Sequence, residues 1–280
     1  MRIFSMILCF LVLSGQVVFA QSLPSRVVNF ESVIFFNGFE HLKTGYYSET
    51  QALADWSDSL RIQSGVFEGR TSIAKDGYRK KVLQILYPTG QFGPDKSGAQ
   101  WELPFFNVYE ELYFSYWVKF PTDFDFVKGG KLPGFIGGEG NTNGHKPNGK
   151  DGWSVRLMWG IDGLVKAYVY HPDQVIQYGD AFSWEHAFIP GRWHHIEVGV
   201  RMNKIGQTNG IIQGWFDGQL SLNIDSIRFR DVAELGIDGF YFSTFFGGGD
   251  ESWATTKREY VLFDEFVIST EPIHGFLFKE

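Results

Sequence analysis

Apolar and polar residues alternate in short runs along most of the chain, which is the pattern of β-strands rather than helices. A helical period is visible only weakly, at residues 48–56 and 231–235. Many short strands with glycine-rich turns and almost no helix are typical of sandwiches and jelly rolls. We therefore predict an all-β fold whose strands cover residues 32–40, 59–67, 80–88, 111–120, 153–159, 164–171, 192–202, 210–224, 239–248 and 260–269.

Two neighbouring runs, 153–159 and 164–171, each have one apolar face. Because successive side chains of a strand point to opposite sides of the sheet, the apolar sets are expected to face the core. An arginine, a serine and two tyrosines are then left together on a wetter face. The residues on this second face are Ser154, Arg156, Met158, Lys166, Tyr168 and Tyr170.

The length of the turn between these two runs decides how they pair. A three-residue loop over 161–163, with Gly163 in the left-handed region, would place Arg156 opposite Tyr168. The same register would place Ser154 opposite Tyr170. A two-residue Asp-Gly turn would instead split the two polar sets onto different faces. Burial of both apolar sets therefore predicts the three-residue loop.

The first twenty residues have the three parts of a secretory signal peptide. Arg2 supplies a basic start, residues 3–12 form an apolar stretch too short to span a bilayer, and residues 18–20 form a small-residue cleavage site. We expect residues 1–20 to be removed on secretion, to the extracellular space or the periplasm. A buried N-terminal helix is the alternative.

The only cysteine, Cys9, lies inside this segment. The mature chain is therefore expected to form no disulfide and to use no thiolate chemistry. No internal repeat, low-complexity tract or linker divides the remainder. Residues 21–280 are long enough for one all-β domain with a large core.

The chain is acidic, with a net charge of −7 that becomes −8 when Arg2 is lost. This argues against a nucleic-acid partner, which would require a basic face. It does not exclude an anionic ligand, because a local basic cleft can lie on an acidic body. Aromatic residues make up 18 % of the chain, a level that is common where sugar rings stack on aromatic faces. No membrane partner is expected after signal removal.

Two lysines, Lys128 and Lys131, lie in the glycine-rich stretch FDFVKGGKLPGFIGGEG, residues 124–140. We interpret this stretch as a loop that can bring a lysine to the polar face of the hairpin. The following segment, 137–152, has no apolar periodicity, and loops of this length are usually functional or disordered. We favour a flexible lid over a cleft, with plain disorder as the alternative.

Several hydrolytic chemistries lack the residues that they need. Glycoside hydrolysis requires paired carboxylates, and the Glu-x-Asp-x-Glu strand of laminarinase-like jelly rolls does not occur. His194 and His195 are adjacent on a strand and face opposite ways, so they cannot chelate one metal together. Ser154 has no G-x-S-x-G elbow and no matched His and Asp.

The polar face of the hairpin suits β-elimination from a polymer of uronic acids. Removal of the C5 hydrogen builds negative charge on the C6 carboxylate, which Arg156 and Lys131 are suited to stabilise. Tyr168 or Tyr170 could act as base or acid, provided that a cation lowers the tyrosine pKa. A lysine beside other cations could also lose its proton and act as the base.

Four stretches, taken together, resemble polysaccharide lyase family 14, which includes alginate lyases of molluscs and an algal-virus lyase. They are FDFVKGGKLPGFIGG, WSVRLMW, AYVYHP and FYFSTFFGGGDESWAT, and the similarity spans roughly residues 100–268. The resemblance implies a concanavalin A-like β-jelly roll with a concave sugar-binding groove. It also implies a catalytic set of one lysine, a Tyr-x-Tyr pair and a Ser-x-Arg pair. Carried onto this chain, these residues are Lys131, Tyr168, Tyr170, Ser154 and Arg156.

Further residues are candidates for contact with substrate. Lys128 could instead be an ordinary solvated loop lysine, and Trp253 is a candidate platform for sugar stacking at the end of the groove. Trp153 and Trp159 are expected in the core. The substrate-binding candidates are Lys128, His145, His171 and Trp253.

No metal, redox or organic cofactor is implied. Where the first and last strands meet, Glu40, Asp264 and Glu265 could hold a structural calcium ion, with a solvated edge as the favoured alternative.

The sequence predicts a secreted polysaccharide lyase that cleaves alginate or glucuronan and leaves an unsaturated uronyl end. The rival hypothesis is a noncatalytic, lectin-like jelly roll that uses the same groove for recognition alone. Internal and terminal cleavage are both open, and either tyrosine is a candidate for base or acid.

Overall fold

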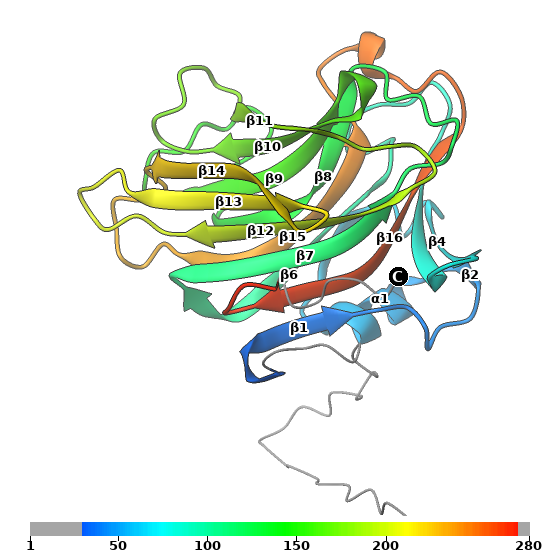
Figure 1. The fold of residues 1–280 in the computed structure, drawn as a ribbon, viewed down its shortest axis with the longest axis horizontal. Helices are drawn as coiled ribbons and strands as arrows, with labels where there is room; N and C mark the ends of the chain where they lie inside the picture. The colour runs from blue at the N-terminus through cyan, green and yellow to red at the C-terminus, as the bar shows by residue number, and fades with distance from the viewer. Residues whose placement is uncertain (1–29, 274–280) are drawn as a thin grey trace, which may run out of the picture.

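The structure is a computed structural model that describes residues 30–273, and in it two antiparallel β-sheets lie face to face (Figure 1). The predicted all-β sandwich is confirmed. The predicted signal peptide and its cleavage site lie outside the described residues.

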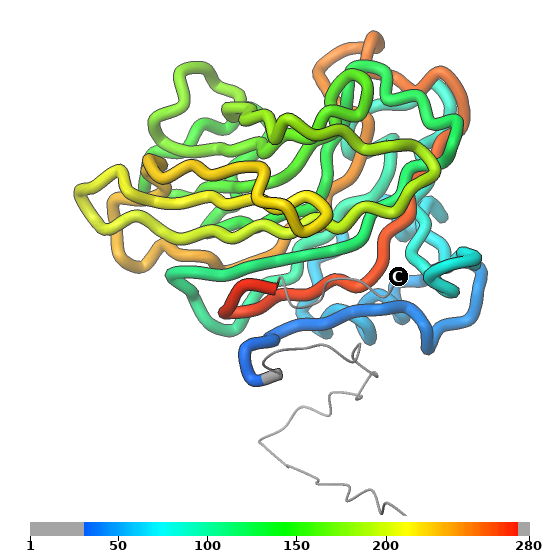
Figure 2. The backbone as a smooth tube through the Cα atoms, viewed as in Figure 1, coloured from blue at the N-terminus to red at the C-terminus, as the bar shows by residue number. Residues whose placement is uncertain are grey.

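The larger sheet has nine strands in the order β14-β13-β12-β7-β16-β5-β4-β2, and β1 also pairs with β16. The first and last strands of the described chain therefore lie side by side (Figure 2). As predicted, the 111–120 run lies inside the sheet, because β7 pairs with β12 and β16. The strands are β1 (Val33–Asn37), β2 (Gly45–Tyr46), β4 (Thr71–Asp76), β5 (Lys80–Tyr87), β7 (Glu111–Lys119), β12 (Trp193–Arg201), β13 (Gly210–Phe216), β14 (Gln219–Ile227) and β16 (Glu259–Ser269).

The smaller sheet has seven strands in the order β11-β10-β9-β8-β15-β6-β3. Its strands are β3 (Arg61–Ser64), β6 (Ala99–Tyr109), β8 (Gly129–Gly138), β9 (Gly152–Gly160), β10 (Leu164–Tyr170), β11 (Asp180–Ala187) and β15 (Ile237–Phe246). One α-helix and three 3-10 turns complete the described chain: α1 (Glu49–Trp56), η1 (Phe30–Ser32), η2 (Ile161–Gly163) and η3 (Glu251–Trp253).

The helix at 49–56 confirms the weak helical period there, whereas residues 231–235 form turns and bends instead. Ser48 caps α1 through a reciprocal capping box with Gln51. At its other end, Trp56 is buried and stacks near Phe35 in the core. Among residues 30–273 no helix is long and apolar enough to cross a membrane.

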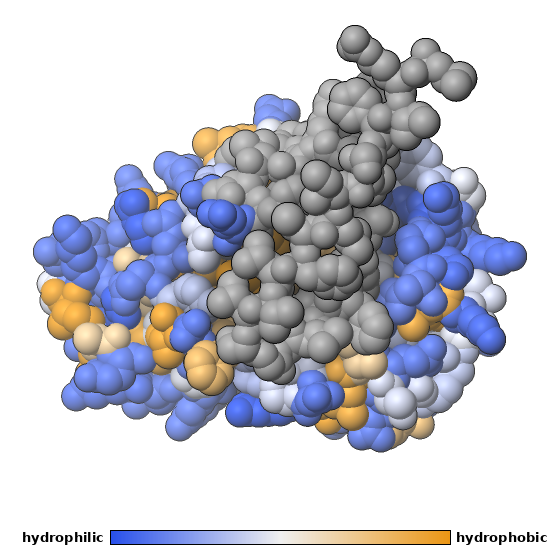
Figure 3. Space-filling view, turned by 90° about the horizontal axis from the view of Figure 1, so that it is seen from below, coloured by the Kyte–Doolittle hydropathy of each residue, from blue (hydrophilic) through white to orange (hydrophobic). Residues whose placement is uncertain are grey.

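The core lies between the two sheets and is rich in aromatic rings. Phe114 of β7 meets Phe135 of β8 edge-on at a centroid distance of 4.8 Å, and it meets Phe240 of β15 at 5.4 Å. Trp153 and Trp159 are fully buried, as predicted. Because the apolar faces of both sheets are used in this contact, each sheet keeps an outer face for polar chemistry. Where described residues are visible from below, the surface is mostly hydrophilic with small apolar spots (Figure 3).

The predicted lysine-glycine loop is wrong, because residues 129–138 form β8 inside the smaller sheet. The glycines inside this strand are required by close packing. A Cβ on Gly130 would lie 2.1 Å from a ring carbon of Trp159, and one on Gly134 would lie 2.1 Å from the carbonyl oxygen of Val155. Lys131 is therefore held on a central strand.

Candidate active site

The β9–β10 hairpin pairs in the register predicted from the sequence. Arg156 lies opposite Tyr168 and Ser154 opposite Tyr170. The turn is the three-residue η2, in which Gly163 has a φ of 76°. Asp162 also takes a positive φ, of 57°, a conformation that aspartate tolerates better than most residues. The outer face of this hairpin thus carries the predicted polar set.

Lys131 reaches the same face from β8, where it pairs with Met158 of β9. The register shifts between Leu132 and Phe135, next to Pro133, which has no N–H to give to the ladder. The Lys131 amine lies 3.0 Å from the Met158 sulfur and 3.7 Å from the centroid of the Tyr168 ring. Three strands therefore bring one amine and one phenol into contact.

The environment of Lys131 favours its neutral form. The side chain is only 9 % exposed, and burial lowers its pKa well below the usual 10.5. The charges of Arg156 and Lys166 lower the pKa further. The amine therefore has a lone pair available at a lower pH than an exposed lysine does.

Arg156 is buried at the centre of the face, between two tyrosine rings. Its guanidinium carbon lies 5.8 Å from the centroid of the Tyr168 ring and 5.6 Å from that of Tyr241. Nη1 donates to Ser243 Oγ at 3.4 Å, whereas Nε has no hydrogen-bond partner in the described structure. Among residues 30–273 no carboxylate forms an ion pair with it. The guanidinium is thus placed to receive an anionic group.

The two predicted tyrosines have different surroundings, although their rings meet edge-on at 5.5 Å. Tyr170 is 1 % exposed, and its hydroxyl accepts the Gly144 N–H at 3.0 Å. Tyr168 is less buried; burial raises its pKa, and the neighbouring Tyr170 raises it further. Arg156 lowers the Tyr168 pKa, as expected, but the effect of burial is larger. The Tyr168 hydroxyl is consequently protonated at neutral pH.

Ser154 is fully buried, and its hydroxyl donates to the carbonyl of Asn141 at 2.7 Å. Together with Gly144 on Tyr170, this bond fixes the 139–151 loop against the outer face of the hairpin. The structure thus places Ser154 as an anchor for the loop, while Lys131, Arg156 and Tyr168 lie together in a separate group, the Lys131 cluster.

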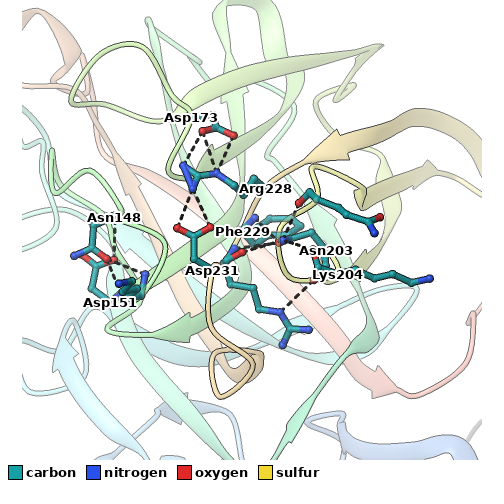
Figure 4. A network of polar contacts seen from close by, with 11 residues as sticks. Asn148, Asp151, Asp173, Asn203, Lys204, Arg228, Phe229 and Asp231 are labelled. Carbon is teal, nitrogen blue, oxygen red and sulfur yellow. Dashed lines mark hydrogen bonds and ion pairs between the residues drawn. The ribbon is translucent and has the colours of Figure 1, made fainter.

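Arg228 links the loops at this end of the sheet (Figure 4). It donates to Asp173 at 2.8 Å and to Asp231 at 2.9 Å. The backbone N–H of Asp231 donates to the carbonyl of Gly149 at 2.7 Å. The 139–151 loop is therefore held at its base as well as over the hairpin.

A polar network beside Arg156 was not predicted from the sequence. The Gln100 amide donates to the Tyr241 hydroxyl at 2.5 Å and to Ser243 at 2.9 Å, and Tyr241 donates to Gln63 at 2.9 Å. Tyr241 and Ser243 alternate along β15 with Phe240 and Phe242, which face the core. This alternation was a signal that could have identified them.

Within residues 30–273, none of the contacts made by the four predicted substrate-binding residues is with Lys131, Arg156 or Tyr168. Lys128 donates to Ser252 at 2.5 Å and lies 5.9 Å from the Trp253 ring, so these two predicted residues do meet each other. His171 is buried, with Nε2 2.9 Å from an Asp180 carboxylate oxygen. His145 is mostly exposed on the 139–151 loop.

Two of the three suggested calcium ligands, Asp264 and Glu265, pair with an arginine instead. Arg79 Nε donates to Asp264 at 2.8 Å, and its Nη2 lies 2.5 Å from a Glu265 oxygen. Asp264 is buried, so the alternative of a solvated edge is also wrong for it. Among residues 30–273 no group of three or more His, Cys, Asp or Glu side chains could hold a metal ion.

The adjacent histidines face opposite ways, as expected, but neither is exposed. His194 lies against Phe216 and shares a hydrogen bond of 2.9 Å with Asp217. His195 lies against Trp117 at a centroid distance of 5.1 Å. Both rings are packed into the larger sheet, away from the Lys131 cluster.

Comparison with known proteins places this geometry in a family. The profile of polysaccharide lyase 14 matches residues 75–266. Exolysin of Paramecium bursaria Chlorella virus 1 is 30 % identical over 193 residues, which cover 58 % of this chain and 29 % of Exolysin. The chain therefore spans less than a third of the length of that relative.

Solved structures agree with the profile. Alginate lyase Aly36B superposes with a TM-score of 0.73 at 27 % identity, covering 84 % of this chain and 96 % of Aly36B. The PL-14 alginate lyase from Aplysia kurodai has a TM-score of 0.73 at 25 % identity, covering 86 % of this chain and all of that enzyme. Since the family profile also matches more than half of the 280 residues, this protein belongs to polysaccharide lyase family 14 and is a carbon–oxygen lyase acting on polysaccharides.

Proposed function

We propose that this lyase cleaves alginate, or the related polyuronate glucuronan, by β-elimination and leaves an unsaturated uronyl end. Two similar enzymes, Aly36B and that of Aplysia kurodai, are alginate lyases, which supports alginate as the first substrate to test. Variants of Aly36B bound to an alginate trisaccharide and tetrasaccharide superpose on this chain with a TM-score of 0.74. The proposed partner is therefore an anionic polysaccharide.

The observation that carries the proposal is the position of the Lys131 amine, 3.7 Å from the Tyr168 ring and on the same face as Arg156. Arg156 binds the C6 carboxylate and stabilises the charge that develops there. The neutral amine of Lys131 takes the C5 proton. The lowered pKa of Lys131 supports this role over that of a second permanent cation.

Tyr168 completes the elimination as the general acid. The electron pair of the C5–H bond forms the C4–C5 double bond while the C4–O4 bond breaks. The Tyr168 hydroxyl gives its proton to the departing O4, because its raised pKa keeps it protonated. Solvent then returns a proton to Tyr168 and removes one from Lys131, so the enzyme is restored.

The test is the ultraviolet absorbance of the new conjugated double bond, followed on polymannuronate, polyguluronate and glucuronan, with a neutral glucan as control. Elimination predicts rising absorbance on at least one polyuronate and none on the neutral polymer. The lectin-like alternative predicts polymer binding without any absorbance change. Product length distributions from the same reactions distinguish internal from terminal cleavage.

We also propose that the protein is secreted to the extracellular space or the periplasm. The basic start and apolar stretch of residues 1–20 support this. The mass of the protein recovered outside the cytoplasm should correspond to a chain that begins at Gln21. A chain that still begins at Met1 would contradict the proposal.

A further inference from the structure

Three basic side chains lie on the outer face of the smaller sheet without an acidic partner: Lys131, Arg156 and Lys166. None of them takes part in the ion pairs formed within residues 30–273. The chain as a whole carries a net charge of −7, so acidic residues are plentiful elsewhere. Buried or half-buried positive charge without a counter-ion is costly. A cluster of this kind is therefore built for a ligand that brings the negative charge.

Lys166 has no role in the proposed elimination, yet its position is fixed relative to that chemistry. It lies opposite Met158 across β9 and β10, and Lys131 lies opposite the same Met158 across β8 and β9. The two lysines thus flank one methionine in a single row, about 10 Å apart at two strand spacings. Side chains in one such row point to the same face.

The side chain of Lys166 extends toward the end of the site where β8 and β9 carry glycine. A Cβ on Gly160 would lie 3.2 Å from Lys166 Cε and 3.4 Å from its Nζ. Gly160 pairs with Gly129, so neither strand places a side chain of its own at this pair, and Lys166 covers the Gly160 backbone. Lys166 is consequently half-buried, with the end of its side chain lying over the Gly160 backbone.

A polyuronate carries one carboxylate on every sugar, so the sugar next to the reacting one brings a second negative charge. Arg156 is assigned to the carboxylate of the reacting sugar. It lies opposite Tyr168, which is two residues from Lys166 along β10, so the two basic groups are offset along the strand. We propose that Lys166 binds the carboxylate of the uronate adjacent to the one that loses its proton, and so selects for consecutive uronates. This inference rests on the proposed polyuronate substrate.

Lys166 also acts on Lys131 through space, since its charge helps to lower the Lys131 pKa. Replacing Lys166 by a neutral residue should therefore raise that pKa and move the acidic limb of activity toward higher pH. A lysine that merely lies in solvent would change neither substrate affinity nor this limb. The pH profile thus gives a second readout that is independent of KM.

The experiment compares Lys166→Gln with Lys166→Arg and with the control Lys75→Gln. Lys75 is an exposed lysine on β4 of the other sheet, so its replacement makes the same change in net charge away from the site. Initial rates are measured on a polyuronate that the wild-type protein cleaves, across salt concentration and pH, with thermal melting to confirm folding.

We expect Lys166→Gln to raise KM roughly tenfold with kcat changed less than about threefold, as for a lost charge-assisted contact. The acidic limb should move up by on the order of half a pH unit, and KM should become less sensitive to salt. Lys166→Arg should recover most of both effects. If Lys166→Gln behaves like Lys75→Gln, the inference is wrong while the lyase proposal stands. If the wild-type protein cleaves no polyuronate, both fail.

Discussion

The Lys131 amine lies 3.7 Å from the centroid of the Tyr168 ring, a position that would also stabilise an ammonium ion. A cation–π contact of this kind contributes about 0.5–2 kcal/mol, or roughly one pKa unit. Full burial can shift a lysine pKa by about 3–5 units in the other direction. Burial, together with the charges of Arg156 and Lys166, therefore outweighs the cation–π contact and lowers the pKa of Lys131, as the proposed role of a base requires.

The pH dependence of kcat/KM should follow these two groups. Activity should rise with pH as Lys131 loses its proton, at a pH below the usual lysine value of 10.5. Activity should fall again only at the pH where Tyr168 ionises. Because the pKa of Tyr168 is raised, this alkaline limb of the profile should lie above pH 10. Rate profiles on a polyuronate provide the measurement. An acidic limb at the usual value for lysine would contradict the assignment.

Lys131 should also make folding stability depend on pH. Its pKa is lower in the folded state than in the unfolded chain, so between the two values the unfolded chain binds more protons. Stability should therefore rise with pH across that window, by at most about 1.4 kcal/mol per pH unit. Urea unfolding of wild type and Lys131→Met across neutral to alkaline pH isolates this contribution. Equal slopes for both proteins would rule it out.

Replacement of Tyr168 and of Tyr170 by phenylalanine should affect different kinetic constants. Tyr168→Phe removes the proposed proton donor, so we expect kcat to fall by about 10²- to 10⁴-fold. Tyr170→Phe leaves the Gly144 N–H without its acceptor and loosens the 139–151 loop, so the main effect should be a KM raised a few-fold. Steady-state rates of both variants on one polyuronate make the comparison. The reverse pattern would transfer the acid role to Tyr170.

Close packing at Gly134 should be measurable as stability. An alanine Cβ there would lie 2.1 Å from the Val155 carbonyl oxygen and 2.7 Å from Arg156 Cα, so β8 and β9 would have to separate. We expect Gly134→Ala to cost about 1–3 kcal/mol of unfolding free energy and to reduce activity by displacing Lys131. Gly77→Ala is the control, since a Cβ at that glycine meets nothing within 4 Å. Similar unfolding midpoints for the two variants would refute the packing argument.

The sequence predicted the hairpin well because burial of two apolar faces allows only one register. Arg156 and Tyr168 are opposite each other for that reason. The β8 strand was not predictable in the same way, because Gly130 and Gly134 interrupt any alternation of apolar and polar residues. Glycine is needed at these two positions because β9 packs closely against them, which the local sequence does not reveal. β6 was missed for a related reason, since Glu102 and Pro104 interrupt its apolar pattern.

Contacts between distant segments account for most of the remaining differences. The 139–151 loop looked free because its anchors, Ser154 and Tyr170, follow it in the chain and give no local signal. The pKa of Tyr168 depends on how deeply three strands bury it, which composition does not reveal. Tyr241 and Ser243, in contrast, alternate with core phenylalanines and were accessible to the same reasoning that identified Arg156.

The role of Lys131 as the base is tested most directly by the initial rate of double-bond formation by Lys131→Met on a polyuronate cleaved by the wild-type protein. Methionine keeps most of the length of the unbranched side chain and removes the amine. We expect a loss on the order of 10³-fold with an unfolding midpoint at least as high as that of wild type, because a poorly solvated amine has been removed. Activity within about tenfold of wild type in the folded variant would show that another group takes the proton.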